Sequence, residues 1–482
     1  MKHRKSSRSG KNKFNRSILR ICYAAVGLFF ALIIYLVWFV QFEAPNVIGS
    51  SYNPRANLMS DRVVRGEIRS ADGEVLAKTQ VGEDGTETRV YPFGSLFAPV
   101  TGYVQKGRTG VESLANFYLL SSHINALQQA GNELVGVKNP GDDLVLTVDS
   151  ALQKTASDAL GDRRGAVIAM DYETGRILCM VSKPTFDPNT IGADWEAITA
   201  EDNDKGQLLN RAAQGAYPPG STFKLVTLLA YVRAHPAAYE DFSFDCTGVY
   251  TDSEGNEIRC YGNTAHGHQN LKQAFANSCN GAFAKLGETL PAADMNAIAK
   301  ELLFNESLPF QLPYLKSSFR LSEEDTAFMK GQTAIGQGRT TISPLHNLLI
   351  ASAVANGGRL MEPMLLDRIV TAGGQEIRTF REKEWGGLLK EEDAALLAEY
   401  MRAVVTDGTG SAFRDAAYET HAKTGSAEYE DGGERKTHAL CIAYAEYGGR
   451  RIAVSVIVED GKSGGSTAAP VARAVMDGWL LR

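Results

Sequence analysis

The sequence of 482 residues has no internal repeat and, apart from a basic N-terminal tail, no low-complexity segment. The absence of a repeat excludes solenoids and propellers, whose structural units recur along the chain. Hydrophobic residues make up 44% of the chain, an ordinary proportion for a globular protein, and the length has room for two to four domains. The chain can therefore bury a large core.

A basic surface is lacking over most of the chain. The formal net charge is -6, although the first twenty residues contain cations and no acidic side chain. The rest of the chain is therefore more acidic than the total suggests, and nothing favours a nucleic acid as a partner. The cations of this tail are Lys2, Arg4, Lys5, Arg8, Lys11, Lys13, Arg16 and Arg20.

Only one uncharged hydrophobic run is long enough to cross a membrane. It extends from Ile21 to Phe42, with Trp38 near its end, and about 20 apolar residues suffice to span the bilayer core. A cleaved signal peptide is the alternative, but the run is long for one and no A-x-A cleavage site follows. We expect an uncleaved single-pass anchor (21–42), a cytoplasmic tail (1–20) and an extracytoplasmic remainder, because cations before a span stay inside.

The six cysteines contain no C-x-x-C pair, the usual spacing of a zinc site. Cys246 and Cys260 flank the turn-rich segment TDSEGNEIR, so that a disulfide could close this hairpin in an oxidising exterior, whereas both would stay free in a reducing one. A zinc site that combines them with His266 and His268 is a weaker alternative. Cys22 lies in the hydrophobic run, and Cys179, Cys279 and Cys441 are predicted to be packed thiols.

The chain divides at Asn139-Pro140-Gly141. Residues 43–140 contain short mixed elements, among them RGEIRSADGEVLA (Arg65–Ala77), which predicts a strand, an Asp-Gly turn and a second strand. After the break, Asp143–Asp149 is typical of a strand and Ser150–Leu160 of a helix.

Residues 141–482 have strand patterns at both ends and mainly helical patterns from about 200 to 360. One hairpin is predicted over Gly165–Ser182 and another over Lys436–Val458, and a closing helix begins at about Pro470. We therefore predict an α+β fold in which one antiparallel sheet is built from both ends of the domain, with a helical insertion between them.

The segment AYPPGSTFKLVTLLAYVRAHP (Ala216–Pro236) predicts a helix that starts near Ser221 and stops at His235-Pro236. Lys224 stands where a capping box has Glu or Gln and where the helix dipole disfavours a cation. Residues three apart share one helix face, and burial would lower the pKa of the lysine, so that it could accept the proton of the serine. Alone, S-x-x-K is a weak signal, and without further motifs an exposed lysine after an N-cap is the better interpretation.

Two further motifs complete an ordered set with S-x-x-K. Ser278-Cys279-Asn280 supplies S-x-N, and Lys423-Thr424-Gly425 supplies K-T-G before a strand-like hairpin. Each triplet alone has an ordinary interpretation, as polar residues that interrupt a helix or as a turn that enters a strand. Their joint occurrence in this order argues against coincidence.

With these motifs the chain resembles the class B penicillin-binding proteins from about residue 50 to its end. Further similar segments are Asn53-Pro54-Arg55, GDDLVLTVDSALQ, AMDYETGRILCMVSKPTFDPN and AIGQGRTTISPLHNLLIASAVANGG. The resemblance implies a penicillin-binding/serine β-lactamase-like transpeptidase domain in residues 141–482, with a five-stranded antiparallel sheet and a helical subdomain. Residues 43–140 would form a small pedestal or dimerisation-type domain.

The resemblance also implies an activity and roles for the motif residues. Such proteins are D,D-transpeptidases that crosslink peptidoglycan stem peptides and are acylated by β-lactams. Ser221 would be the nucleophile that attacks the penultimate D-Ala carbonyl, and Lys224 would be its base. Ser278 would relay the proton to the leaving D-Ala, and Asn280 would hold the substrate amide and orient Lys224.

Substrate binding is implied for the third motif. Lys423 would keep the site electropositive, and Thr424 and Ser426, which flank Gly425, would meet the terminal carboxylate of the substrate. The backbone N–H groups of Ser221 and Ser426 would form the oxyanion hole. No metal or organic cofactor is implied, and the expected partner is a membrane glycosyltransferase of the shape, elongation, division and sporulation family.

Alternative functions remain to be considered, for the same motif residues and for one other segment. A β-lactamase or a D,D-carboxypeptidase shares the motifs, but no sequence motif supplies a deacylating carboxylate. A non-enzymatic β-lactam sensor would need a cytoplasmic output domain, which twenty basic residues do not provide. GQTAIGQGRT (Gly331–Thr340) approaches a phosphate loop, but Gln337 replaces the lysine, and a turn that enters a helix at 343–356 is preferred.

Overall fold

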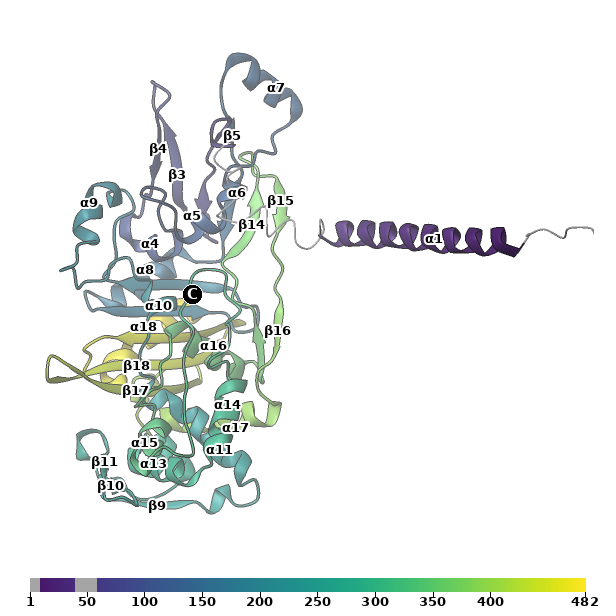
Figure 1. Ribbon diagram of the computed structural model, residues 1–482. Coiled ribbons are helices and arrows are strands. Elements are labelled where there is room, and N and C mark those ends of the chain that lie inside the picture. Colours follow the sequence, from purple (N-terminus) through teal and green to yellow (C-terminus); the bar gives the residue numbers. More distant parts are fainter. Residues whose placement is uncertain (1–8, 40–58) are drawn as a thin grey trace, which may run out of the picture.

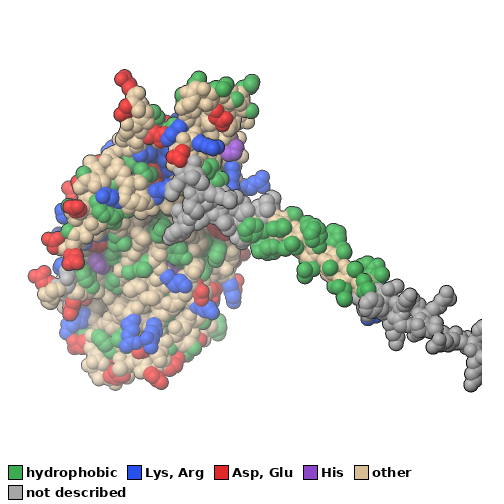
Figure 2. Space-filling model, turned by 45° about the horizontal axis from the view of Figure 1, so that its top comes forward, with side chains coloured by type: hydrophobic (Ala, Val, Ile, Leu, Met, Phe, Trp, Pro, Cys, Tyr) green, Lys and Arg blue, Asp and Glu red, His purple; other side chains and the backbone are tan. Residues whose placement is uncertain are grey.

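The structure is a computed structural model that describes residues 9–39 and 59–482. Helix α1 (Ser9–Trp38) projects from a folded body, and its hydrophobic side chains form a continuous green rod in Figure 2. Ile18–Trp38 is long and apolar enough to cross a membrane, and none of it is buried in the body. The start of the basic tail (1–8), the end of the predicted span (40–42) and Asn53-Pro54-Arg55 lie outside the described residues.

A five-stranded antiparallel sheet forms the centre of the body (Figure 1) and confirms the predicted union of the two ends of the domain. Its strand order is β17-β18-β19-β7-β8, and β19 pairs with β7 in the register Val454↔Ala169. Both predicted hairpins are present as β7–β8 and β18–β19. The strands are β7 (Gly165–Met170), β8 (Ile177–Lys183), β17 (Thr420–Asp431), β18 (Glu434–Tyr447) and β19 (Arg450–Val458).

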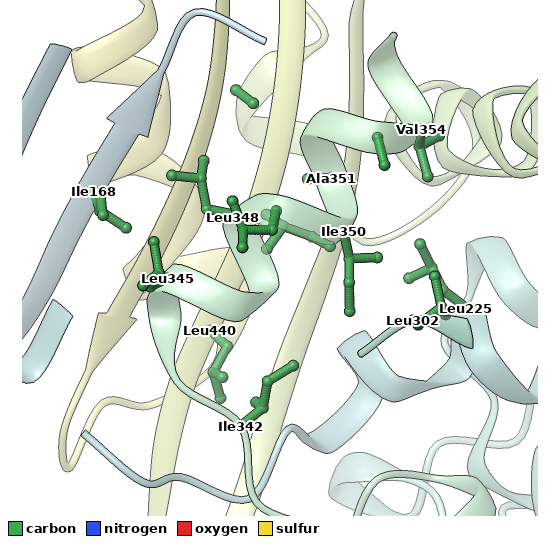
Figure 3. Packing of buried hydrophobic residues seen from close by; sticks show 14 of the residues in the cluster. Ile168, Leu225, Leu302, Ile342, Leu345, Leu348, Ile350, Ala351, Val354 and Leu440 are labelled. Atoms are coloured by element: carbon green, nitrogen blue, oxygen red, sulfur yellow. The ribbon is translucent and has the colours of Figure 1, made fainter. Parts of the chain in front are cut away.

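Alternate residues of the sheet pack into two cores, because successive strand side chains point to opposite faces. Val167 and Ala169 pack with α8 (Ser150–Leu160) and α18 (Ala469–Leu480) in one cluster. Ile168 packs on the other face with α16 (Pro344–Ala355). In Figure 3, Leu345 and Leu348 of α16 lie toward the sheet, whereas Ile350 lies toward Leu225 and Leu302 of the helical region. The helix thus joins the sheet to the helical insertion.

The helical insertion forms the lower half of the body in Figure 1. It also contains two small two-stranded sheets, β9–β12 and β10–β11, and the second encloses the turn-rich segment between Cys246 and Cys260. The strands are β9 (Ser243–Cys246), β10 (Val249–Thr251), β11 (Glu257–Arg259) and β12 (Gly267–Asn270). The helices of this half are α11 (Lys224–Ala234), α12 (Leu271–Ala276), α13 (Asn280–Thr289), α14 (Ala292–Glu301), α15 (Ala327–Ala334) and α17 (Glu391–Thr406). Two helices lie higher in Figure 1: α9 (Ile191–Ile198), which packs with Ala98 and Tyr103 of the N-terminal part, and α10 (Arg211–Gln214), beside the central sheet.

The upper part of the body is built around a six-stranded sheet of order β15-β14-β6-β2-β3-β4. The predicted Arg65–Ala77 hairpin is present, with Ile68 opposite Ala77. Strands from both sides of the break at residue 141 share this sheet. Its strands are β2 (Ile68–Arg69), β3 (Val75–Val81), β4 (Glu87–Val90), β6 (Asp143–Leu146), β14 (Leu366–Val370) and β15 (Glu376–Thr379).

Short elements complete this part. The N-terminal helices are α4 (Ala98–Thr101), α5 (Gly110–Leu114), α6 (Asn116–Leu119) and α7 (Ala126–Val135). The remaining strand pair of this part is β1 (Val63–Val64) with β5 (Asn139–Pro140). The pair β13 (Arg359–Met361) and β16 (Glu384–Gly387) lies lower in Figure 1, where β13 contacts α16.

Candidate active site

The S-x-x-K motif lies at the junction of two helical segments. Ser221 is in the one-turn 3-10 helix η3 (Gly220–Phe223), and Lys224 is the first residue of α11, which ends before His235 as predicted. Phe223 occupies the N-cap position, and no side chain caps this helix. Ser221 is therefore not the N-cap that a serine at a helix start suggests, and its side chain lines an open groove instead.

A glycine-rich loop supports the turn that carries Ser221. The backbone N–H of Gly220 donates to the carbonyl of Gly336 over 2.9 Å. Gly336 has φ +79°, and a Cβ there would lie 1.9 Å from the carbonyl oxygen of Gly220. The segment that approaches a phosphate loop in sequence thus packs against the serine turn.

Lys224 is completely buried and points at the S-x-N segment. Its ammonium donates to the carbonyl of Ser278 over 2.6 Å and to Oδ1 of Asn280 over 2.8 Å. The ring of Phe283 lies 5.4 Å from its Nζ. Burial lowers the pKa of Lys224 to about 8. At neutral pH roughly a tenth of the lysine is then the free amine.

The S-x-N segment is held in an unusual backbone conformation. Ser278 has φ +56°, a value that a residue other than glycine adopts at a cost and that often marks functional sites. Cys279 is the N-cap of α13 and accepts from the N–H of Ala282, and Asn280 is the first residue of the helix. The Asn280 amide donates to the carbonyl of Arg259 over 2.9 Å. Its oxygen is thereby oriented toward Lys224.

The K-T-G motif lies on β17, next to the other two motifs. Lys423 is completely buried, and its Nζ donates to Oγ of Ser278 over 2.9 Å and to the carbonyl of Thr424 over 3.0 Å. Burial, and next the neighbouring charge of Lys224, hold the pKa of Lys423 well below its ordinary value. Within residues 9–39 and 59–482, no carboxylate forms an ion pair with Lys224 or Lys423. The hydroxyl of Ser278 therefore lies between two buried amines.

The strand β17 passes directly along the serine turn. A Cβ on Gly425 would lie 3.2 Å from the carbonyl of Pro219 and 3.3 Å from the N–H nitrogen of Thr222, so the glycine permits this close approach. Ser426 and Ser221 line the same groove, and the Ser426 hydroxyl accepts from the N–H of Gly464 over 3.2 Å.

Models of two known protein domains match this chain. The model of the penicillin binding protein transpeptidase domain matches residues 165–477, and that of the penicillin binding protein A dimerisation domain matches residues 65–144. The chain belongs to the penicillin-binding protein family.

Relatives within the penicillin-binding proteins match most of the chain. The peptidoglycan D,D-transpeptidase PbpA of Mycolicibacterium smegmatis is 30% identical over 96% of this chain and 98% of its own length. The peptidoglycan D,D-transpeptidase MrdA of Acinetobacter baumannii is 30% identical over 82% of this chain and 66% of its own length.

Solved penicillin-binding protein structures are similar as well. The ceftriaxone acyl-enzyme complex of penicillin-binding protein A from M. tuberculosis has a TM-score of 0.77 at 28% identity and covers 88% of this chain and 99% of its own. A D,D-transpeptidase domain from Eggerthella lenta has a TM-score of 0.75 at 29% identity, with 86% and 99% covered. The α+β fold predicted from the sequence is confirmed.

The three penicillin-binding motifs meet in a polar groove of about 1200 Å³. Ser221, Ser278, Asn280, Thr424 and Ser426 contribute to its lining. Thr409 also lines the groove, and its hydroxyl hydrogen-bonds with that of Thr424 over 2.6 Å. The sequence did not point to Thr409, because the only local signal is a glycine-flanked turn, D-G-T-G, far from the K-T-G motif.

The cysteines near this groove form neither the predicted disulfide nor the predicted group with His266 and His268. The sulfurs of Cys246 and Cys260 lie 3.7 Å apart, whereas bonded sulfurs lie about 2.05 Å apart, so the disulfide is not formed. His268 is at the surface and contacts Asp245. Instead, Cys279 joins Cys246, Cys260 and His266. In the described part of the chain these four are the group of side chains suited to hold a metal ion.

Proposed function

We propose that the protein is a serine-type peptidoglycan D,D-transpeptidase. Ser221 attacks the penultimate D-Ala carbonyl of one stem peptide, the terminal D-Ala leaves, and an amine of a neighbouring stem peptide takes the acyl group. The observation that supports this best is the burial of Lys224 beside the S-x-N segment, which lowers its pKa to about 8. A partly neutral amine three residues from a serine can serve as its base.

The contacts of Lys224 and Ser278 support the following route to the acyl-enzyme. The neutral Lys224 accepts the proton of Ser221 Oγ, which forms an ester bond with the substrate carbonyl carbon. The amide bond between the two D-Ala residues breaks. Ser278 lies between Lys224 and Lys423 and passes a proton to the departing amine. The proton that left the serine thus ends on the free D-Ala.

Crosslinking reverses these proton movements. The acceptor amine attacks the ester carbonyl, the new amide bond forms, and the ester bond to Ser221 Oγ breaks. The proton lost by the amine returns to the serine oxygen by way of Ser278 and Lys224. A β-lactam forms the same ester, but its opened ring stays attached, so that no leaving group departs to make room for the acceptor.

Binding of the substrate carboxylate is assigned to the K-T-G motif. Thr424 and Ser426 line the groove and would meet this carboxylate, with Gly425 allowing the strand to pass close to the serine turn. Lys423 is buried behind them, where it donates to Ser278 and would keep the site electropositive. The backbone N–H groups of Ser221 and Ser426 would donate to the anionic oxygen of the tetrahedral intermediate. One such donor is worth about 3 to 4 kcal/mol in other acyl-transfer enzymes.

The position of the enzyme in the cell is part of the proposal. Residues 21–42, most of which belong to the apolar helix Ile18–Trp38, would anchor the chain with residues 1–20 inside and the body outside, next to its peptidoglycan substrate. Residues 43–140 would act as a pedestal and 141–482 as the transpeptidase domain. A membrane glycosyltransferase of the shape, elongation, division and sporulation family would contact the anchor and the pedestal.

The main rival uses water instead of an amine. A β-lactamase or D,D-carboxypeptidase needs a group that activates water at the acyl-enzyme. No carboxylate of the described residues hydrogen-bonds with Ser221, Lys224 or Lys423. This arrangement favours transfer to an amine.

The experiment is labelling of the full-length, membrane-bound protein with a fluorescent penicillin. The wild type should be labelled and Ser221→Ala should not. Ser411→Ala is the matched control, because Ser411 lines the same groove outside the three motifs. An unlabelled wild type would mean that the proposed mechanism is wrong, and an adduct that hydrolyses within seconds would favour the β-lactamase.

A further inference from the structure

Four potential metal ligands converge beside the S-x-N segment. The sulfurs of Cys246 and Cys260 are 3.7 Å apart, and those of Cys260 and Cys279 are 3.8 Å apart. Nδ1 of His266 lies 3.3 Å from the sulfur of Cys246. All four ligand atoms lie within 4.8 Å of one another, and the three cysteines are buried.

The three separations of 3.3, 3.7 and 3.8 Å are close to those of a tetrahedral zinc site. Zinc–sulfur bonds of about 2.3 Å place neighbouring sulfurs about 3.8 Å apart, and a zinc–nitrogen bond of about 2.1 Å places sulfur and nitrogen about 3.5 Å apart. We propose that Cys246, Cys260, His266 and Cys279 bind one Zn²⁺ ion in a Cys₃His site. Four protein ligands complete the coordination, which is typical of a structural and not a catalytic zinc.

The chemistry of the ligands selects the metal. Thiolates and imidazole suit zinc, whereas Mg²⁺ and Ca²⁺ require oxygen ligands, and no oxygen belongs to this group. A disulfide between Cys246 and Cys260 would use only two of the three thiols and leave Cys279 and His266 without a role. No C-x-x-C pair marks the site in the sequence, because each ligand comes from a different segment of the chain.

The metal would tie together segments that form one wall of the groove. Cys246 ends β9, Cys260 follows β11, and His266 precedes β12, whereas Cys279 lies between Ser278 and Asn280. The hydrogen bond from the Asn280 amide to the carbonyl of Arg259, the residue before Cys260, links two of these segments. The zinc would thus hold the strained Ser278 conformation in place. This inference does not depend on the reaction at Ser221.

The first test is the metal content of the full-length protein, purified in detergent micelles under reducing conditions from cells supplied with zinc. About one zinc ion per chain is expected. Cys260→Ser and His266→Ala should lose it. Cys179→Ser, at a buried cysteine of β8, and His268→Ala, two residues beyond His266, should retain it.

A second test uses the wild type alone, in case the variants fail to fold. Replacement by Co²⁺ should produce the absorption of thiolate-bound tetrahedral cobalt. Removal of the metal with a chelator should lower the unfolding temperature, and Zn²⁺ but not Mg²⁺ should restore it. A zinc content below about a tenth of an ion per chain, or a Cys246–Cys260 disulfide found by mass spectrometry in the purified protein, would overturn the proposal. Zinc that persists in both Cys260→Ser and His266→Ala would do the same.

Discussion

The ammonium of Lys224 donates a 2.8 Å hydrogen bond to the side-chain oxygen of Asn280. Lys224 is the first residue of α11, and Asn280 is the first residue of α13. A cation at a helix N-terminus opposes the dipole of its own helix. The amide oxygen of Asn280 and the carbonyl of Ser278 offset part of this cost without adding a charge. The lysine is therefore held in position while its pKa stays low.

Asn280→Ala should slow acylation by a β-lactam by roughly 10- to 100-fold, because a hydrogen bond to a charged group contributes about 1.5 to 3 kcal/mol. The measurement is the second-order rate constant of acylation by a fluorescent penicillin. Asn132→Ala, in α7 of the N-terminal part, is the control and should leave the rate unchanged. An unaltered rate in Asn280→Ala would remove Asn280 from the role assigned to it.

The acylation rate of the wild type should rise with pH through about 8. Burial lowers the pKa of Lys224, so the free amine grows from about a tenth at pH 7 to about a half at pH 8 and nearly all at pH 9. The measurement is the same rate constant between pH 6 and pH 9.5. A flat profile over this range would contradict the assignment of Lys224 as the base.

Asn280→Asp offers a sharper version of this test. The carboxylate keeps an acceptor for Lys224 but adds a negative charge, which favours the protonated lysine and raises its pKa. The rate profile should move to higher pH, with a larger loss at pH 7 than at pH 9. A uniform loss at every pH would indicate a purely structural effect.

The motifs and the sheet were predictable because each depends on local pattern. Alternation of apolar residues predicts β7–β8 and β18–β19, and residue types at fixed spacing mark Ser221, Lys224, Ser278, Asn280 and Lys423. The structure places Ser221, Ser278 and Asn280 in the lining of one groove. Lys224 and Lys423 are buried behind it and hydrogen-bond with the S-x-N segment.

The rest depends on contacts between segments that are distant in sequence. The hydroxyl of Thr409 hydrogen-bonds with that of Thr424, which belongs to another element of the fold. The backbone N–H of Gly220 donates to the carbonyl of Gly336, more than a hundred residues away in the sequence. The sequence predicted Cys279 to be a packed thiol, because its proximity to Cys246 and Cys260 depends on how the small strands β9, β10, β11 and β12 are arranged in the fold. No periodicity or spacing in the sequence carries such information.

Gly336→Ala should impair the serine turn far more than an ordinary glycine substitution. Its Cβ would lie 1.9 Å from the carbonyl oxygen of Gly220, so that the backbone must move. Acylation should fall by about two orders of magnitude or more, as expected when a reacting group is displaced by about 1 Å. The measurement is the labelling rate of the folded protein.

Gly357→Ala is the matched control for this substitution. Gly357 also has a positive φ, of +63°, but nothing lies within 4 Å of a Cβ placed there. Gly357→Ala should lower the stability only through backbone strain, by about 1 kcal/mol, and should leave the acylation rate unchanged. Equal effects of the two substitutions would show that the contact with Gly220 is unimportant.

Glu112→Gln should destabilise the N-terminal part of the body without removing the active site. Glu112 is completely buried between Arg65 and Arg89, at 2.6 and 2.7 Å. Burial alone would raise the pKa of Glu112, but the two arginines outweigh it and the pKa is lowered. The carboxylate therefore stabilises the fold above its unfolded pKa of 4.5, and this stabilisation is lost as the pH falls through the folded value.

Removal of one partner from such a buried group costs about 3 to 5 kcal/mol, which thermal unfolding of the full chain at pH 7 would detect. Glu133→Gln, at an exposed position of α7, should change the unfolding temperature little, and an equal effect of both substitutions would contradict the importance of the buried cluster.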